Sequence, residues 1–262
     1  MTPTTLAVDH YDRLLADHYT WMLGGDLPRL VAGQRALLEE SGVLPDGPGR
    51  RAVDLGCGPG HTSLALAALG FDTVLAVDLS RQLLGELAAH AAGVPAVRPV
   101  HADLRTALRE HVGRGTADAV VCLGDTLTHL PTRGDVAALL NDVAAALTPD
   151  GTALLSYRDL TVPLTGTDRF LPVRATEDRI MTCFLEYPDD FDDYTVVVHD
   201  LVHVRESAGG GENWTLKTGS YRKLRVSHDW VLRQCRTAGL RLVGERAGHG
   251  GVFRTVALRL AG

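Results

Sequence analysis

The chain has 262 residues, of which 45% are hydrophobic and 22% are charged, and its formal net charge is −6 at pH 7. This length and composition suit one globular domain with its own core, or one domain that carries a large insertion. The acidic balance argues against a general nucleic-acid binder, because such proteins usually present a basic face.

The cysteines and the first residues bear on the compartment. Cys57, Cys122, Cys183 and Cys235 are scattered, with no C-x-x-C pair and no histidine at zinc-ligand spacing. We therefore expect free thiols in a reducing compartment and no metal site. The N-terminus lacks the apolar run of a secretory signal, and no apolar stretch is long enough to span a bilayer. A cytoplasmic protein without membrane contact is the expectation.

Two helices are predicted before the first strand, over residues 9–23 and 28–40, with Pro28 in the first turn of the second. The first helix is dense in amphipathic rings. Tyr11 and Tyr19 lie about two turns apart and so share one face.

Residues 46–160 alternate between strand and helix patterns. Apolar strands are predicted at 51–55, 73–77, 97–101, 117–123 and 152–157, with helices at 62–69, 81–92, 106–111 and 134–147. Ser80 is a good N-cap, and Gly70 is suited to end the helix before it. Alternation of helices with apolar strands predicts a parallel sheet that is covered on both faces.

Beyond residue 160 the apolar period changes to two. Strands at 170–176, 180–187, 194–205 and 214–226 predict an antiparallel meander, and a helix at 228–238 precedes a strand pair at 241–247 and 253–260. We therefore predict a seven-stranded, mostly parallel α/β domain with an inserted meander. The expected parts are N-terminal helices in 1–45, the α/β domain in 46–160 and 228–262, and the insertion in 161–227.

The most informative segment is the glycine-rich turn Asp54-Leu55-Gly56-Cys57-Gly58-Pro59-Gly60-His61, which follows a strand and opens a helix. Glycines let the chain turn tightly and let a ligand lie against the backbone. A dinucleotide fingerprint requires glycine at 56, 58 and 61, but residue 61 is histidine and the third glycine falls at 60. The spacing therefore disfavours a nicotinamide dinucleotide.

This turn resembles motif I of the class I S-adenosylmethionine-dependent methyltransferases, D/E-x-G-x-G-x-G. The resemblance implies a Rossmann-like fold in which the loop packs against the methionine and ribose of the cofactor. It also implies that the acid orients the methionine ammonium group. The cofactor-binding residues implied here are Asp54, Gly56, Cys57, Gly58 and Gly60.

Two further acids stand in register with this motif. Asp78 and Leu79 end the second strand, where a carboxylate accepts hydrogen bonds from both ribose hydroxyls. NAD enzymes share this acid, so it does not decide the cofactor alone. Asp103 and Leu104 follow the third strand, where the family places an aspartate on the adenine amino group and the adjacent amide on a ring nitrogen. A lone aspartate at such a place is otherwise a helix cap.

The fourth strand ends in Leu123-Gly124-Asp125-Thr126-Leu127-Thr128-His129, which resembles motif IV of the glycine/sarcosine N-methyltransferase-like branch. The resemblance implies that Leu123 and Gly124 border the sulfonium and that His129 contacts the cofactor. The Asn/Asp-Pro-Pro-Tyr/Phe motif of nucleic-acid amino-methylating enzymes is not present at this position, which favours a small-molecule acceptor.

Methyl transfer from a sulfonium needs few catalytic groups, because the donor is already activated. A general base is needed only if the acceptor is protonated, and His129 is the best candidate, with a structural loop histidine as the alternative. Arg158 would clamp an acceptor carboxylate or pair with an acid of the protein. In related methyltransferases an N-terminal helix covers the cofactor and a tyrosine touches its methionine end. Tyr11 and Tyr19 would then bind the cofactor, and Tyr19 would assist catalysis; the alternative is an aromatic stripe packed on the core.

The sequence thus predicts an S-adenosylmethionine-dependent methyltransferase that acts on a small-molecule N or O nucleophile and releases S-adenosylhomocysteine. The insertion is expected to cover the substrate or to form a homodimer interface. Two alternatives stay open. One is a different reaction of the same sulfonium, such as a cyclisation that releases methylthioadenosine. The other, less favoured, is an NAD-dependent oxidoreductase.

Overall fold

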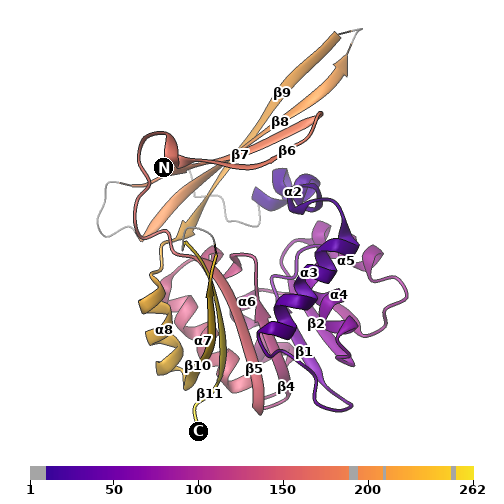
Figure 1. Cartoon of the computed structure of the whole chain (residues 1–262), viewed down its shortest axis with the longest axis vertical. Coiled ribbons are helices and arrows are strands. Elements are labelled where there is room, and N and C mark those ends of the chain that lie inside the picture. Colours follow the sequence, from indigo (N-terminus) through magenta and orange to yellow (C-terminus); the bar gives the residue numbers. More distant parts are fainter. Residues whose placement is uncertain (1–9, 189–193, 209–210, 249–251) are drawn as a thin grey trace. The chain divides into compact units, whose positions relative to one another are not determined.

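A computed structural model describes residues 10–188, 194–208, 211–248 and 252–262. The chain divides into two compact units, each with its own sheet (Figure 1). The larger unit comprises residues 26–159 and 226–262, and the smaller comprises 1–25 and 160–225. The helix predicted at 28–40 is therefore part of the larger unit and not of the N-terminal segment.

The larger unit is built on a seven-stranded sheet in the order β10-β11-β5-β4-β1-β2-β3. Its strands are β1 (Arg51–Leu55), β2 (Thr73–Asp78), β3 (Val97–His101), β4 (Ala117–Cys122), β5 (Leu147–Arg158), β10 (Leu240–Ala247) and β11 (Phe253–Leu260). The first five are parallel, and β11 pairs antiparallel with both β5 and β10. The predicted seven-stranded, mostly parallel sheet is confirmed. Since β2 and β4 flank β1, the strand order reverses there, and ligands of such sheets bind at the carboxyl ends next to this switch point.

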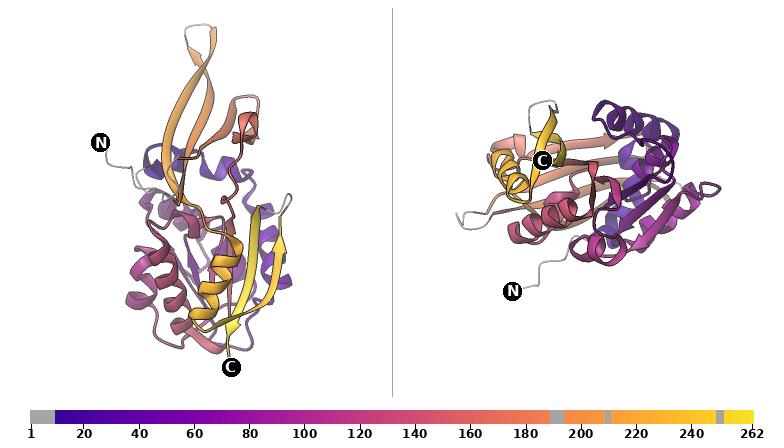
Figure 2. Two further views of the ribbon diagram at one scale, coloured as in Figure 1. Left: turned by 90° about the vertical axis from the view of Figure 1, so that its left-hand side faces the viewer. Right: turned by 90° about the horizontal axis from the view of Figure 1, so that it is seen from below.

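Helices cover both faces of this sheet (Figure 1 and Figure 2). They are α3 (Leu27–Glu40), α4 (His61–Ala68), α5 (Arg81–His90), α6 (Leu104–His111), α7 (Arg133–Ala146) and α8 (His228–Thr237). On one face α3 packs on α4, and on the other α7 packs on α6 and α8. Side-chain caps begin several of these helices, including Ser80 before α5 and Thr132 before α7. None of the helices in the described ranges is both long and apolar enough to cross a membrane.

Among the elements whose bounds differ from the prediction, α6 and β5 start earlier for identifiable local reasons. Helix α6 starts at Leu104 and not at residue 106, because the Asp103 side chain accepts the backbone N–H of Arg105 and caps the helix earlier. Strand β5 starts at Leu147 and not at residue 152, because Leu147 already pairs with Ala117 across a β-bulge.

The strands are fixed by an apolar core between the sheet and its helices. Leu38 of α3, Leu66 of α4, Val74 of β2, Val121 of β4 and Leu154 of β5 are all completely buried in one cluster. Each side chain of this kind stabilises the fold by about 1.5–3 kcal/mol when it leaves water. The core therefore holds the carboxyl ends of the parallel strands in fixed positions.

The smaller unit contains the predicted antiparallel meander, with strands in the order β6-β7-β8-β9. They are β6 (Phe170–Ala175), β7 (Arg179–Glu186), β8 (Thr195–Ala208) and β9 (Gly211–Leu224). The N-terminal segment of this unit is not the single helix predicted over 9–23. It consists of a π-helical turn (Tyr11–Leu15), a 3₁₀ turn (Ala16–His18) and the short helix α2 (Tyr19–Leu23), while Asp9 lies outside the described residues.

Packing against the sheet accounts for the irregular winding of this segment, since tertiary contacts override a local helical preference. Leu14 and Leu15 are buried with Met181, Val198 and Val202 of the meander in a second apolar cluster.

A buried polar contact anchors the same segment. His10 Nε2 lies 2.7 Å from Asp200 Oδ2 of β8, and both side chains are almost fully buried. Cys183 of β7 donates its thiol to the other carboxylate oxygen over 2.9 Å, and the Tyr221 ring lies 4.6 Å from the imidazole. A Cβ atom at Gly219 would overlap the His10 ring. The imidazole thus occupies a slot that exists because residue 219 is glycine.

We predict that Gly219→Ala destabilises the protein by about 1–3 kcal/mol, because it separates a buried hydrogen-bonded pair. In an ordinary strand position the same change would be neutral or favourable, since alanine restricts the unfolded chain. Urea denaturation measures the difference. Ser220→Ala, at the exposed neighbouring position, is the matched control, and equal stability of the two variants would contradict the slot.

Candidate active site

The glycine-rich turn joins β1 to α4 through three left-handed glycines. Gly56, Gly58 and Gly60 have φ values of 74°, 53° and 94°, which side chains rarely adopt. A Cβ at Gly56 would overlap Thr126 after β4, and a Cβ at Gly60 would overlap Leu87 of α5. Packing within the protein therefore requires glycine at two of these three positions, whether or not a ligand is bound.

Asp54 is a buried carboxylate on β1, directly before this turn. It is 1% exposed, and Ser63 Oγ donates to its Oδ2 over 2.7 Å. Burial raises the pKa of Asp54 to about 7, the charge of Asp78 adds to the shift, and the bond from Ser63 opposes it. A positive group beside Asp54 would favour its charged form. The site therefore fits the ammonium end of a ligand.

Asp78 closes the turn from the end of β2. Its Oδ2 accepts the backbone N–H of Gly58 over 2.8 Å, and its Oδ1 accepts that of Ser80 over 2.9 Å. The side chain is half-buried, and the neighbouring Leu79 is 38% exposed. A carboxylate in this position fits the hydroxyl groups of a ribose, since these are hydrogen-bond donors.

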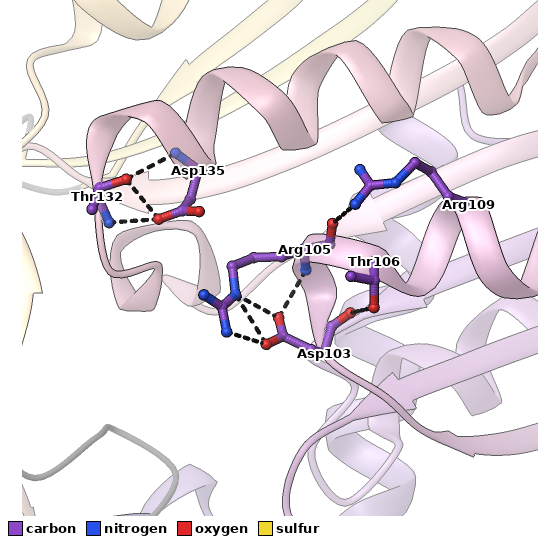
Figure 3. Close-up of polar contacts among 6 residues, drawn as sticks. All are labelled: Asp103, Arg105, Thr106, Arg109, Thr132 and Asp135. Carbon is purple, nitrogen blue, oxygen red and sulfur yellow. Dashed lines mark hydrogen bonds and ion pairs between the residues drawn. The ribbon is translucent and has the colours of Figure 1, made fainter.

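Asp103 lies at the carboxyl end of β3 and caps α6 (Figure 3). It is held by Arg105, whose backbone and side-chain nitrogens lie 2.5–3.1 Å from its two carboxylate oxygens. This hydrogen bonding lowers the pKa of Asp103. Leu104, the first residue of α6, is buried. Asp103 has the helix-cap role that we had named as the alternative, and its contact with adenine stays a prediction.

The segment after β4 carries a backbone feature that the sequence did not reveal. Asp125 is a buried residue with a φ of 75°, the single non-glycine residue with positive φ in the described ranges. Its Oδ1 accepts the backbone N–H of Arg158 at the end of β5 over 2.8 Å. Strained residues of this kind cluster at functional sites. An aspartate directly after Gly124 is a weak signal for it, because Asp tolerates the left-handed region.

The other predicted residues of this edge lie around Asp125. Leu123 is buried, whereas Gly124 is exposed with open space where a Cβ would be, and its N–H donates to Ser156 Oγ over 2.9 Å. His129 is the last residue of the 3₁₀ turn η3 (Thr126–His129) and is partly buried.

Arg158 has an exposed side chain at the end of β5. Its guanidinium lies 6.0 Å from the centre of the Phe253 ring, and no ion pair of Arg158 occurs within the described part of the chain. The alternative, a pairing of Arg158 with Asp159 or another acid, is not found among the described residues, and the Asp159 carboxylate accepts the backbone N–H of His228 over 3.0 Å. Arg158 thus presents its charge to solvent at this edge of the sheet.

Tyr11 and Tyr19 belong to the smaller unit. Their ring centres lie 5.7 Å apart, and Tyr11 also lies 6.5 Å from Tyr221 of β9. The two rings thus form the aromatic packing that we had named as the alternative to a lid, and their role toward the cofactor stays a prediction.

The larger unit therefore brings most predicted site residues to the carboxyl edge of one sheet. These are Asp54, Gly56, Cys57, Gly58, Gly60, Asp78, Leu79, Asp103, Leu104, Leu123, Gly124, His129 and Arg158. In the described part of the chain, no group of three or more His, Cys, Asp or Glu residues is placed to hold a metal ion.

We predict that Asp54 makes the fold less stable as the pH rises. Its folded pKa is raised, so between about pH 4 and 7 the native state binds a proton that the unfolded state has lost, and stability falls with increasing pH. Asp54→Asn should remove this loss, which amounts to a few kcal/mol because one pKa unit is about 1.4 kcal/mol. Urea denaturation at pH 4.5 and pH 8 measures it, with exposed Asp150→Asn as control. Parallel pH profiles of wild type and Asp54→Asn would contradict the prediction.

Comparisons with known proteins find relatives for part of the larger unit. A family model described as a methyltransferase domain matches residues 52–151. A glycine/sarcosine N-methyltransferase of Aphanothece halophytica is 33% identical over 118 residues, which are 45% of this chain and 43% of that protein. The chain thus spans less than half the length of the curated relatives it matches.

Solved structures resemble a larger part of the chain. An S-adenosylmethionine-dependent methyltransferase from Clostridium acetobutylicum gives a TM-score of 0.70 at 15% identity and covers 97% of both chains. S-adenosylmethionine-bound CalS10, an amino pentose methyltransferase from Micromonospora echinaspora, gives 0.66 at 18% identity and covers 94% of this chain and 96% of that one. At such identities the likeness concerns the fold. The chain has the class I methyltransferase fold, and its residues 52–151 match the family model of a methyltransferase domain.

Proposed function

We propose that this protein is an S-adenosylmethionine-dependent methyltransferase that acts on a small-molecule N or O nucleophile and releases S-adenosylhomocysteine. The observation that carries the proposal is the pair of acids, Asp54 and Asp78, that flanks a left-handed glycine turn at the switch point of the sheet. The match of residues 52–151 to a methyltransferase domain supports it.

The acids and the turn suit the methionine and ribose parts of the cofactor. When bound, S-adenosylmethionine supplies a methyl group that its sulfonium already activates. Asp54 would hold the methionine ammonium group, because its buried carboxylate gains from a cation. Asp78 would hold the ribose hydroxyls while it also fixes Gly58. These two roles distinguish the ends of the ligand and set its direction along the sheet edge.

The remaining residues of the edge are assigned to the adenine, the sulfonium and the acceptor. Asp103 and Leu104 would receive the adenine, and the segment from Leu123 to His129 would border the sulfonium. His129 would act as the base when the acceptor is protonated. Arg158, with its exposed guanidinium, would bind an acceptor carboxylate.

The class of acceptor is taken from the relatives' names. They include a glycine/sarcosine N-methyltransferase, ubiquinone biosynthesis O-methyltransferases and an amino pentose methyltransferase. All these names concern small molecules, which supports a small acceptor here and leaves N and O both open. The four free cysteines favour a reducing compartment, and we propose the cytoplasm. Tyr11 and Tyr19 as cofactor contacts, and the meander as substrate cover or homodimer interface, stay predictions.

The reaction class is tested by product analysis. The full chain is incubated with S-adenosylmethionine and a panel of small amines, amino acids, amino sugars and phenols, and the nucleoside products are separated by mass. We expect S-adenosylhomocysteine together with one methylated acceptor. Methylthioadenosine without a methylated acceptor would instead establish the alternative sulfonium chemistry. Calorimetry with NAD is the control, since tighter binding of NAD than of S-adenosylhomocysteine would favour an oxidoreductase.

A pair of variants tests the adenine contact. Asp103→Asn keeps the helix cap, because Asn caps as well as Asp. It replaces the charged carboxylate by a neutral amide, which is a weaker hydrogen-bond acceptor for the adenine amino group. We expect S-adenosylhomocysteine to bind about 5–20-fold more weakly, the effect of one charge-assisted hydrogen bond. Arg105→Ala removes the protein partner of Asp103 and leaves the carboxylate, so affinity should change less than threefold in calorimetry. Unchanged affinity in Asp103→Asn would show that this residue serves the helix alone.

A further inference from the structure

Cationic side chains gather at one end of the four-stranded sheet in the smaller unit. Arg174 of β6 pairs in register with Met181 of β7, which is buried against the N-terminal segment. Arg179 lies two residues before Met181 on the same strand, so both arginines share its face of the sheet. Lys217 of β9 pairs with the buried Val202 of β8 and also belongs to this face.

The short helix α2 places an aromatic ring among these charges. The guanidinium carbons of Arg174 and Arg179 lie 5.5 Å and 5.0 Å from the centre of the Trp21 ring, within the range of cation–π attraction. Trp21 Nε1 donates to Thr176 Oγ1 over 3.3 Å, which orients the ring. Both guanidinium groups therefore lie against one aromatic ring despite their like charge.

Among the described residues, no acid forms a close ion pair with these cations, although the charge of Arg179 contributes, after the hydrogen bond from Thr176, to the lowered pKa of Asp178. In the described ranges neither Arg174, Arg179 nor Lys217 forms an ion pair. The carboxylate nearest in sequence, that of Asp178, accepts the hydroxyl of Thr176 over 2.7 Å. The Nε atoms of both arginines are buried without a hydrogen-bond partner among the described residues. Buried donors of this kind call for an explanation, since an unmade hydrogen bond of a charged group is costly.

The contacts and the pKa of His18 indicate the same positive electrostatic potential. Arg179 donates from Nη1 to His18 Nδ1 over 2.9 Å. Because arginine can only donate, Nδ1 of His18 is the acceptor and carries no proton. Burial lowers the pKa of His18, and the charges of Arg179 and Lys217 lower it further, while Asp17 acts in the opposite direction. The neighbourhood thus disfavours an added positive charge and favours a negative one.

We propose that Arg174 and Arg179, which lie against Trp21, form with the neighbouring His18 and Lys217 a binding site for an anionic group, a carboxylate or a phosphate. A guanidinium presents parallel N–H donors that match the oxygens of either group, and two of them on a rigid ring form a preorganised receptor. The site lies entirely within the smaller unit. The binding of an anion at this site does not rest on the proposed function.

The experiment titrates the full chain with sodium pyrophosphate, inorganic phosphate and succinate at constant ionic strength, by calorimetry. We expect saturable binding of at least one probe, and its identity separates phosphate from carboxylate recognition. Arg179→Gln and Arg174→Gln should each weaken that binding at least tenfold. Arg179→Lys keeps the charge but loses the parallel N–H donors of the guanidinium, so its affinity should lie between those of wild type and Arg179→Gln. Absence of saturable binding to wild type, or unchanged binding in both glutamine variants, overturns the proposal.

Arg169→Gln is the matched control. Arg169 also stacks on an aromatic ring, with its guanidinium 4.8 Å from the centre of Phe184, but it lies outside the cluster. We expect the anion affinity of this variant to lie within twofold of that of wild type. A loss of affinity equal to that of the Arg174 and Arg179 variants would show that only the net charge matters, and would overturn the proposed site. Circular dichroism and urea denaturation of every variant check the fold, and Arg179→Lys decides the matter if a glutamine variant fails to fold. S-adenosylhomocysteine binding is measured in parallel: its absence with anion binding intact overturns the proposed function alone.

Discussion

The candidate site depends on two carboxylates that approach one glycine turn from neighbouring strands. Asp78 fixes the turn by accepting the N–H of Gly58, while Asp54 lies buried behind it and is pushed toward its neutral form by burial and by the charge of Asp78. Such an arrangement is unfavourable for the protein alone and favourable with a cation. The apolar core around β1, β2 and β4 holds the carboxyl ends of these strands in place. The favourable free energy of burying this core offsets the cost of placing the two carboxylates close together.

Features set by neighbouring residues could be predicted from the sequence, and features set by distant ones could not. The strands, most helices and the acids at the strand ends follow from local periodicity and motif spacing. The anchoring of His10 by Asp200 links residues 190 positions apart, and no local pattern announces it. For the same reason the regular helix predicted over 9–23 was wrong. The left-handed backbone of Asp125 and the capture of Asp103 by Arg105 depend on single side chains that the motifs do not specify.

The two units differ in how far the matching family model extends over them. The methyltransferase model matches residues within the larger unit alone, and this unit supplies the edge with Asp54, Asp78 and Asp103. The meander and the N-terminal segment form a separate core around Met181 and Val202. One part therefore matches a domain that other proteins share, and the other is free to differ in the ligands that its charged face selects.

The packing of the glycine turn also affects how this fold changes during evolution. Gly56 and Gly60 are confined by Thr126 and Leu87, so a descendant that no longer used a cofactor would still retain them. Asp54 has the opposite position, because without a cationic ligand its buried charge is only a liability. In a lineage drifting toward a non-catalytic role, the acid should be replaced before the glycines. The glycine pattern would then persist in sequences whose enzymatic role has already ended.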